Sequence, residues 1–155
     1  MQYRNKTKYN NKNNETMKTN NPTTAEAFAN YRSAEGSNLR SYGSDIWSYR
    51  TMIAQNVNGV ILLTFRDYSN TTQRHKLHIR RAAQEAQRVL FEVVNINPTK
   101  PEEHKDNYNY LLEIARGYKA KADRARTEAN RQRYGKLFAE ARQTAREYYI
   151  KFIQA

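Results

Sequence analysis

The sequence predicts an α+β fold: a small antiparallel β-hairpin sheet packed on a helix, followed by a C-terminal α-helical hairpin. Two β-favouring stretches flank the pair Asn58-Gly59, which supplies a tight hairpin turn. From Ile79 onward, apolar residues instead recur at helical spacing. The last two apolar stripes, residues 111–129 and 134–152, are separated by five residues, which breaks the 3/4 helical spacing. One straight helix cannot present both stripes on the same face, so a helical hairpin is predicted.

Three parts are expected along the chain: residues 1–22, 23–97 and 98–155. The first is rich in Asn, Lys and Thr. Such a segment cannot bury enough apolar surface to offset the entropy of ordering, so a disordered basic tail is predicted. The second part is predicted to be the small α+β module, and the third the helical hairpin.

Within the module, the first expected element is a short helix that Thr23 or Thr24 caps. The strands of the β-hairpin are expected between Ile46 and Phe65, with a third short strand possible at residues 38–42. Ser69 or Asn70 can cap the next helix. Its apolar positions run from residue 79 to 93, so we expect it to end before residues 97–98, Asn-Pro.

Pro101 marks a new helix start, because proline is tolerated in the first turn of a helix. Glu102 and Glu103 follow, and acidic side chains favour the positive end of the helix dipole. One apolar stripe runs over residues 111–129 and another over residues 134–152. We expect a break near Asn130, with a continuous helix that contains a local discontinuity as the alternative.

Composition narrows the classes of function. The 155-residue chain has no cysteine, which excludes disulfides, thiolate nucleophiles and Cys-based zinc sites. It has no apolar run long enough to span a membrane and no secretory signal at its start, so a soluble cytoplasmic protein without a membrane partner is expected. The formal net charge is +12, and residues 1–22, 23–100 and 101–155 contribute +4 each. Nucleic acid is therefore the leading partner, with simple solubility as the alternative explanation.

Two short motifs carry a resemblance. The residues LRSYGSDI at 39–46 and YSNTTQRH at 68–75 resemble a small module in uncharacterised bacteriophage-encoded proteins, in which S-Y-G-[ST]-x-I precedes Y-S-x-T-T-x-x-H. The resemblance covers residues 39–80. Trp47 stands where that family more often has a small residue, and the helices after Val94 have no counterpart in it. The resemblance implies a phage origin, and hence the host-cell cytoplasm, but no assigned activity.

The first candidate contact surface is a stripe of arginines on the helix after Ser69. Arg74, Arg81 and Arg88 recur every seven residues, with Lys76 and Arg80 on the flanks. Regularly spaced cations of this kind can follow a phosphate backbone. A solvated helix face is the competing interpretation.

The second candidate surface lies in the middle of the C-terminal helices, where basic residues crowd together. Tyr118 and Tyr134 are interleaved with them and could either stack on unpaired bases or pack in a core. Nearby acids such as Asp123 could instead pair with the cations along the helix. The predicted contacts here are Lys119, Arg124, Arg126, Arg131 and Arg133, within a stretch that also contains Arg116, Lys121 and Lys136.

No residue pattern predicts catalysis, a metal or a cofactor. His75 and His78 diverge by about 60° on an α-helix, and no acid clusters with them, so His75 is predicted to be structural. Phosphate-binding loops, nucleophile elbows and zinc helices are absent from the sequence. A nuclease built from dispersed residues is the alternative.

The sequence therefore predicts a non-enzymatic, phage-encoded nucleic-acid-binding accessory protein that contacts DNA or RNA phosphates through basic helices. One alternative is an inhibitor of a host defence or host enzyme, of the anti-restriction or anti-CRISPR type, with a host protein as partner. Another is a virion or assembly component that self-associates through its alanine-rich helices, so a homo-oligomer remains open.

Overall fold

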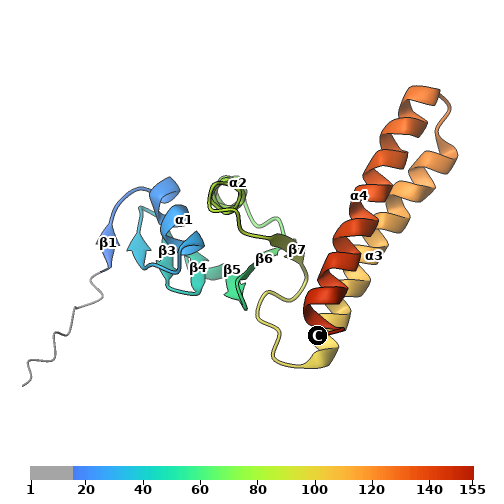
Figure 1. Cartoon of the computed structure of the whole chain (residues 1–155). Coiled ribbons are helices and arrows are strands. Elements are labelled where there is room, and N and C mark those ends of the chain that lie inside the picture. The colour runs from blue at the N-terminus through green and yellow to red at the C-terminus, as the bar shows by residue number, and fades with distance from the viewer. Residues whose placement is uncertain (1–15) are drawn as a thin grey trace, which may run out of the picture.

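The computed structural model describes residues 16–155 and has an α+β architecture (Figure 1). A mixed sheet of seven strands is followed by a helical hairpin, and the strands lie in the sheet in chain order. The strands are β1 (Met17–Lys18), β2 (Ala34–Glu35), β3 (Leu39–Tyr42), β4 (Asp45–Ser48), β5 (Thr51–Val57), β6 (Val60–Thr64) and β7 (Leu90–Val93). The helices are α1 (Asn21–Ala29), α2 (Asn70–Glu85), α3 (Pro101–Arg124) and α4 (Glu128–Phe152). The predicted α+β class and helical hairpin are confirmed, but the sheet is mixed and has seven strands rather than forming a small antiparallel hairpin.

The turns of the sheet follow local sequence signals. Asn58 and Gly59 have φ angles of 50° and 80°, the left-handed conformation that a two-residue hairpin turn needs. The predicted hairpin of β5 and β6 is thus confirmed. Gly43 has a φ of 66° in the turn between β3 and β4. The antiparallel pairing of β3 with β4 confirms the possible third strand. The pairs β2–β3, β3–β4, β4–β5 and β5–β6 are antiparallel, whereas β1–β2 and β6–β7 are parallel.

The predicted disordered tail, residues 1–22, extends too far toward the C-terminus, because residues 17–22 include β1 and the start of α1. Residues 1–15 lie outside the described residues, but β1 pairs with β2, and the Thr19 N–H donates to the Glu35 carbonyl at 2.9 Å. Asn20 then caps α1 by accepting from the Thr23 N–H at 2.8 Å, so neither predicted threonine is the cap. Backbone hydrogen bonds order this polar segment, and composition cannot reveal them.

The predicted helix, which begins after a cap at Ser69 or Asn70 and ends before residues 97–98, is wrong beyond Glu85. Helix α2 ends at Glu85, and β7 then adds parallel to β6, with Leu62 opposite Phe91. Gln87 ends the helix in a left-handed conformation (φ 54°), and the Arg88 N–H closes the turn on the Ala83 carbonyl at 2.8 Å. Glycine usually fills this position, so the sequence has no clear stop signal here. The apolar residues of β7 also happen to continue the helical spacing.

Two apolar cores cover opposite faces of the sheet. Helices α1 and α2 lie on the same side of the sheet and pack on residues such as Leu39, Ile46 and Ile61 (Figure 1). The hairpin of α3 and α4 packs on the other face through residues such as Leu62 and Phe91. Among residues 16–155, only β6, β7 and the end of β5 contribute strand residues to this second core. The hairpin therefore covers one end of that face.

The hairpin itself forms as predicted, although its break comes a few residues earlier than expected. Helix α3 ends at Arg124 and α4 begins at Glu128, where Thr127 accepts from the Asn130 N–H at 3.2 Å. The predicted helix start at Pro101 is confirmed, with Glu103 accepting from the Lys100 N–H at 3.0 Å. No helix between residues 16 and 155 has the length and apolar character needed to cross a membrane.

One buried phenol anchors the base of the hairpin to the sheet. The Tyr148 side chain is fully buried, and its ring meets Phe91 edge-on at 5.2 Å between centroids. Its hydroxyl lies 2.8 Å from His104 Nδ1 and accepts from Asn107 Nδ2 at 2.8 Å. The Asn107 Oδ1 accepts from the Asn95 N–H at 2.7 Å. Burial raises the pKa of Tyr148 to about 12, so this phenol remains a neutral hydrogen-bonding group at physiological pH.

A buried ion pair joins α2 to β7. Lys76 has a side chain that is 0% exposed, and its Nζ lies 3.0 Å from Glu92 Oε1 and 3.4 Å from Asp67 Oδ1. The same ammonium donates to the Arg66 carbonyl at 3.2 Å. Burying a cation without a partner carries a large desolvation penalty. The Lys76 ammonium can therefore be buried only because these acceptors compensate it.

We predict that Glu92→Gln lowers the free energy of unfolding by about 3 kcal/mol, because it leaves the Lys76 charge without its nearest anion. Urea unfolding followed by circular dichroism would measure the change. The matched control is Glu113→Gln, which removes an exposed partner of Arg116 and should change stability by less than about 0.5 kcal/mol. Equal effects of the two substitutions would contradict a structural role for the buried pair.

Candidate nucleic-acid interface

The predicted stripe on α2 does not form a continuous basic surface. Lys76 is buried in the ion pair with Glu92 and cannot reach a phosphate, which corrects its predicted role. Arg80 Nη2 lies 2.8 Å from the second carboxylate oxygen of Glu92. The sequence does not show this pairing, because the predicted helix contains Glu92 together with Arg80, whereas Glu92 lies on β7.

The remaining residues of the stripe do not act as a set. The Arg88 guanidinium lies 5.2 Å above the Tyr31 ring, and its Nε donates to the Ala29 carbonyl at 3.2 Å. Arg88 thus fastens α1 to the end of α2. Arg74 and Arg81 are exposed and form no ion pair with another described residue. The structure therefore leaves only these two residues of the stripe available on α2.

Basic residues gather instead at the distal end of the hairpin, which we call the basic tip (residues 116–136). This stretch has eight basic and two acidic side chains, a net charge of +6. The rest of the C-terminal segment, residues 101–115 and 137–155, has four basic and six acidic side chains, a net charge of −2. Charge is thus segregated along the axis of the hairpin, positive at the end away from the anchor of Tyr148.

The acids of the basic tip neutralise only some of its cations. Lys119 Nζ lies 3.2 Å from Asp123, and Arg131 Nη1 lies 2.6 Å from Glu128. At its edges, Arg116 pairs with Glu113, and Lys136 pairs with Glu140 at 4.0 Å. Four exposed cations form no ion pair within residues 16–155, namely Lys121, Arg124, Arg126 and Arg133.

Tyr118 and Tyr134 belong to the same surface. The Lys121 ammonium lies 5.6 Å from the Tyr118 centroid and 5.8 Å from the Tyr134 centroid, so it bridges α3 and α4. The Arg133 guanidinium lies 5.7 Å from the Tyr134 centroid. Cation–π contacts at these distances hold the cations over the rings. Both rings are half-buried, and each therefore packs in the hairpin while also supporting a cation.

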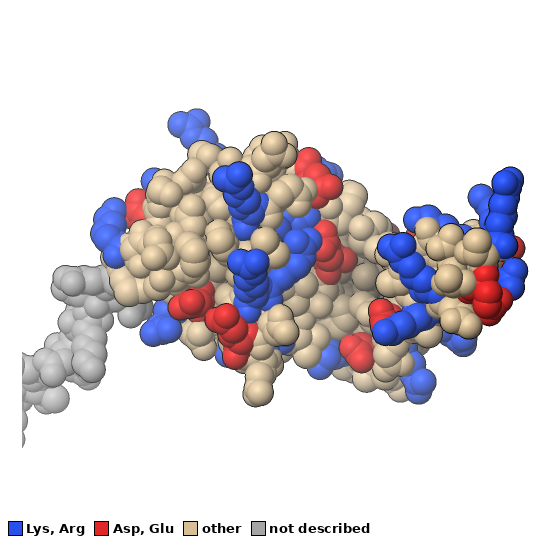
Figure 2. Space-filling view, turned by 90° about the horizontal axis from the view of Figure 1, so that it is seen from above, with Lys and Arg blue, Asp and Glu red and all other residues tan. Residues whose placement is uncertain are grey.

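Figure 2 views the molecule from above, with the distal end of the hairpin at the right. Basic side chains project there in several directions, and acidic side chains occupy a smaller part of that outline. Over the rest of this face, blue and red side chains are mixed. The predicted contacts do not include Lys121, although its spacing of three residues from Tyr118 is a signal that identifies it.

Ser48 and His75 have the spacing of a catalytic pair but lie in the interior. Ser48 Oγ is 2.7 Å from His75 Nδ1 and 3.2 Å from Thr72 Oγ1. Ser48 is 2% exposed and His75 is 1% exposed, so a substrate cannot reach them. Ser69 caps α2 by accepting from the Thr72 N–H at 3.2 Å. The histidine thus links α2 to β4.

The described part of the chain contains no cluster of side chains that could hold a metal ion. Within residues 16–155, no three His, Asp or Glu side chains come close enough to hold a metal ion. Comparison with protein-family models, with curated proteins and with solved structures finds no match for this chain. The function must therefore be inferred from the residues and geometry of the chain itself.

We predict that acidification from pH 7.5 to 5.5 lowers the free energy of unfolding. Burial lowers the pKa of His75, and the nearby charge of His78 lowers it further. The unfolded chain binds this proton near the ordinary pKa of 6.5, whereas the folded protein does not. Stability is therefore full above that pH and falls below it, by up to about 1.4 kcal/mol per pH unit for each such site.

Urea unfolding across this pH range would measure the effect. His75→Gln should remove part of the pH dependence, because His104, whose pKa is also lowered by burial, retains the rest. A pH dependence that is the same with and without His75 would show that its ring titrates equally in both states.

Proposed function

We propose that this is a non-enzymatic nucleic-acid-binding protein that contacts phosphates through the basic tip of its helical hairpin. The observation that carries the proposal is the segregation of charge, with a net +6 in residues 116–136 and −2 in the rest of the C-terminal segment. Charge that served only solubility would have no reason to collect at one end. A concentrated positive surface attracts polyanions and releases their counterions on binding.

The position of the tip supports the same function. The apolar contacts of the hairpin with the sheet come from its proximal half, from residues such as Tyr108, Leu111 and Tyr148. Figure 1 shows the distal end extending past the sheet. The unpaired cations come from both helices and from the connection between them, so they can meet several phosphates of one strand. Lysine and arginine contacts of this kind position a protein on nucleic acid without selecting a sequence.

The phage origin, the host-protein inhibitor and the virion component remain predictions from the sequence. Arg74 and Arg81 on α2 stay available for a secondary contact. Lys76, Arg80 and Arg88 are excluded from the proposed surface because internal partners occupy them.

We predict that replacing the four unpaired cations of the tip by glutamine weakens binding to DNA and RNA oligonucleotides. Each lost phosphate contact removes about 0.7 to 0.9 from the slope of log affinity against log salt concentration, so the slope should fall by about 3. Fluorescence anisotropy of a labelled oligonucleotide at several salt concentrations would measure it. The substitutions are Lys121→Gln, Arg124→Gln, Arg126→Gln and Arg133→Gln.

The matched control removes the same charge from the other half of the hairpin, where four exposed cations also lack an ion pair among the described residues. The control substitutions are Lys105→Gln, Arg142→Gln, Arg146→Gln and Lys151→Gln. This variant should keep most of the affinity. Equal loss in the two variants would mean that net charge, not the basic tip, drives binding, and no binding by the unmodified protein at low salt would refute the proposed function.

A further inference from the structure

The face of β3, β4 and β5 opposite α1 and α2 has no covering layer in the described part of the chain. Leu39 and Ile46 point into the core under the helices, so their neighbours Arg40 and Trp47 point to the other face. No residue of β3 or β4 takes part in the core beneath the hairpin. In the register of the sheet, Arg40 pairs with Trp47, and Trp47 pairs with Met52. A half-buried indole therefore lies beside an exposed arginine on an open sheet.

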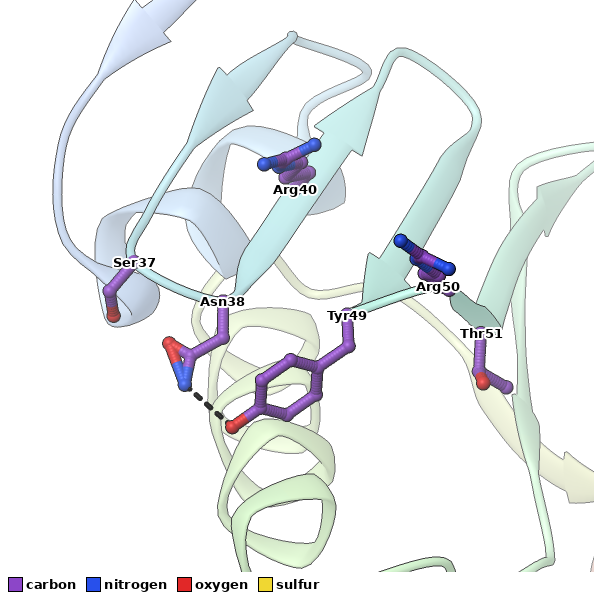
Figure 3. A pocket seen from close by; sticks show the side chains of 6 residues that line it. All are labelled: Ser37, Asn38, Arg40, Tyr49, Arg50 and Thr51. Carbon is purple, nitrogen blue, oxygen red and sulfur yellow. Dashed lines mark hydrogen bonds between the residues drawn. The ribbon is translucent and has the colours of Figure 1, made fainter.

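A cavity of about 550 Å³ adjoins this row at the ends of the strands. Its lining residues are Ser37, Asn38, Arg40, Tyr49, Arg50 and Thr51 (Figure 3). Figure 3 shows the side chains of Arg40 and Arg50 in front of the strands, on the same side of the sheet. The volume lies within the range of roughly 300 to 1,000 Å³ that is common for small-ligand sites.

The cations of the cavity are not fully neutralised. Glu35 lies 3.4 Å from Arg40 Nε, but the same carboxylate also pairs with Lys18 at 2.6 Å. Arg50 is exposed and has no ion pair within the described residues. The two guanidinium groups of Arg40 and Arg50 therefore line one cavity. The only carboxylate that pairs with either of them within the described residues, Glu35, is shared with Lys18. The remaining positive charge is complementary to a phosphate.

The rim of the cavity is held in place by Tyr49. This residue has a φ of 54°, a left-handed conformation that is unfavourable for an aromatic side chain. Its hydroxyl accepts from Asn38 Nδ2 at 2.8 Å, and its N–H donates to the Asn38 carbonyl at 2.9 Å. These bonds fix the turn before β3 against the turn before β5. Ser37 and Arg50 thus keep their places at the cavity.

We propose that this surface binds one unpaired nucleotide of the nucleic acid, with the base stacked on Trp47 and the phosphate between Arg40 and Arg50. The inference rests on the proposed function and narrows it to a single strand. Aromatic side chains on an open sheet, next to basic and hydroxyl groups, are a recurrent way to hold unstacked bases. A duplex hides the faces of its bases, so it cannot place one on the indole.

The chain has a single tryptophan, so its fluorescence reports on this site alone. Titration of the full-length protein with a short, unlabelled oligothymidylate strand should quench the emission of Trp47 to a plateau, because a stacked base quenches the indole. The blunt duplex of the same length should leave the emission near its starting value. Equal quenching by both would overturn the preference for a single strand.

Variants then separate the site from general charge effects. Arg40→Gln with Arg50→Gln should weaken binding of a labelled single strand about tenfold, and so should Trp47→Ala. Arg32→Gln with Arg66→Gln is the control of equal charge, because both arginines are exposed and lie outside the cavity and the tip. This control should weaken binding less than twofold. Equal weakening by the two double variants would overturn the proposed site.

The two proposals fail in distinguishable ways. If the strand binds and loses affinity in the basic-tip variant while Trp47 emission does not change, the nucleotide site is refuted and the proposed function stands. If no strand binds by anisotropy, both are refuted. If Trp47 emission changes with protein concentration alone, a second copy of the chain covers this face, and the nucleotide site is refuted.

Discussion

The hairpin is fixed to the sheet only at its base, and the proposed function depends on this constraint. The buried hydroxyl of Tyr148 receives its hydrogen bond from Asn107, which also binds the backbone of Asn95. One residue thereby ties the end of α4, the start of α3 and the segment after β7 together. Because the anchor lies at one end, the other end is free to carry charge that a packed surface would have to neutralise. A net +6 at the tip is tolerated for this reason.

The sheet divides its two faces between stability and exposure. One face is closed by α1 and α2, with the bond between Ser48 and His75 and the ion pair of Lys76 fixing α2 in place. Within the described residues, the other face is covered only where β6 and β7 meet the hairpin. The open part carries Trp47 and Arg40, which add nothing to the core. The proposed nucleotide site would use both of these side chains.

Local signals predicted much of the fold. Asn58-Gly59, Ser69 and Pro101 each act through their own backbone geometry, so the turn and the two helix starts could be read directly from them. Strand β7 could not be predicted from local signals, because it depends on pairing with β6 and follows a helix that ends at Gln87 without a glycine. The predicted phosphate contact of Lys76 is wrong for the same reason, since its partner Glu92 is on that strand. The alternating residues at 38–42 and from Ile46 onward contain the signal for the face of Trp47 and Arg40, but the prediction there extends only to strands.

In the proposed function, phosphates lie against the basic tip and not against the rest of the hairpin. Acetylation of lysines, followed by mass spectrometry with and without a single-stranded oligonucleotide, tests it within one molecule. Protection of Lys121 and Lys136 with unchanged reactivity of Lys105 and Lys151 is the expected result. Equal protection of all four lysines, or none, would contradict the claim.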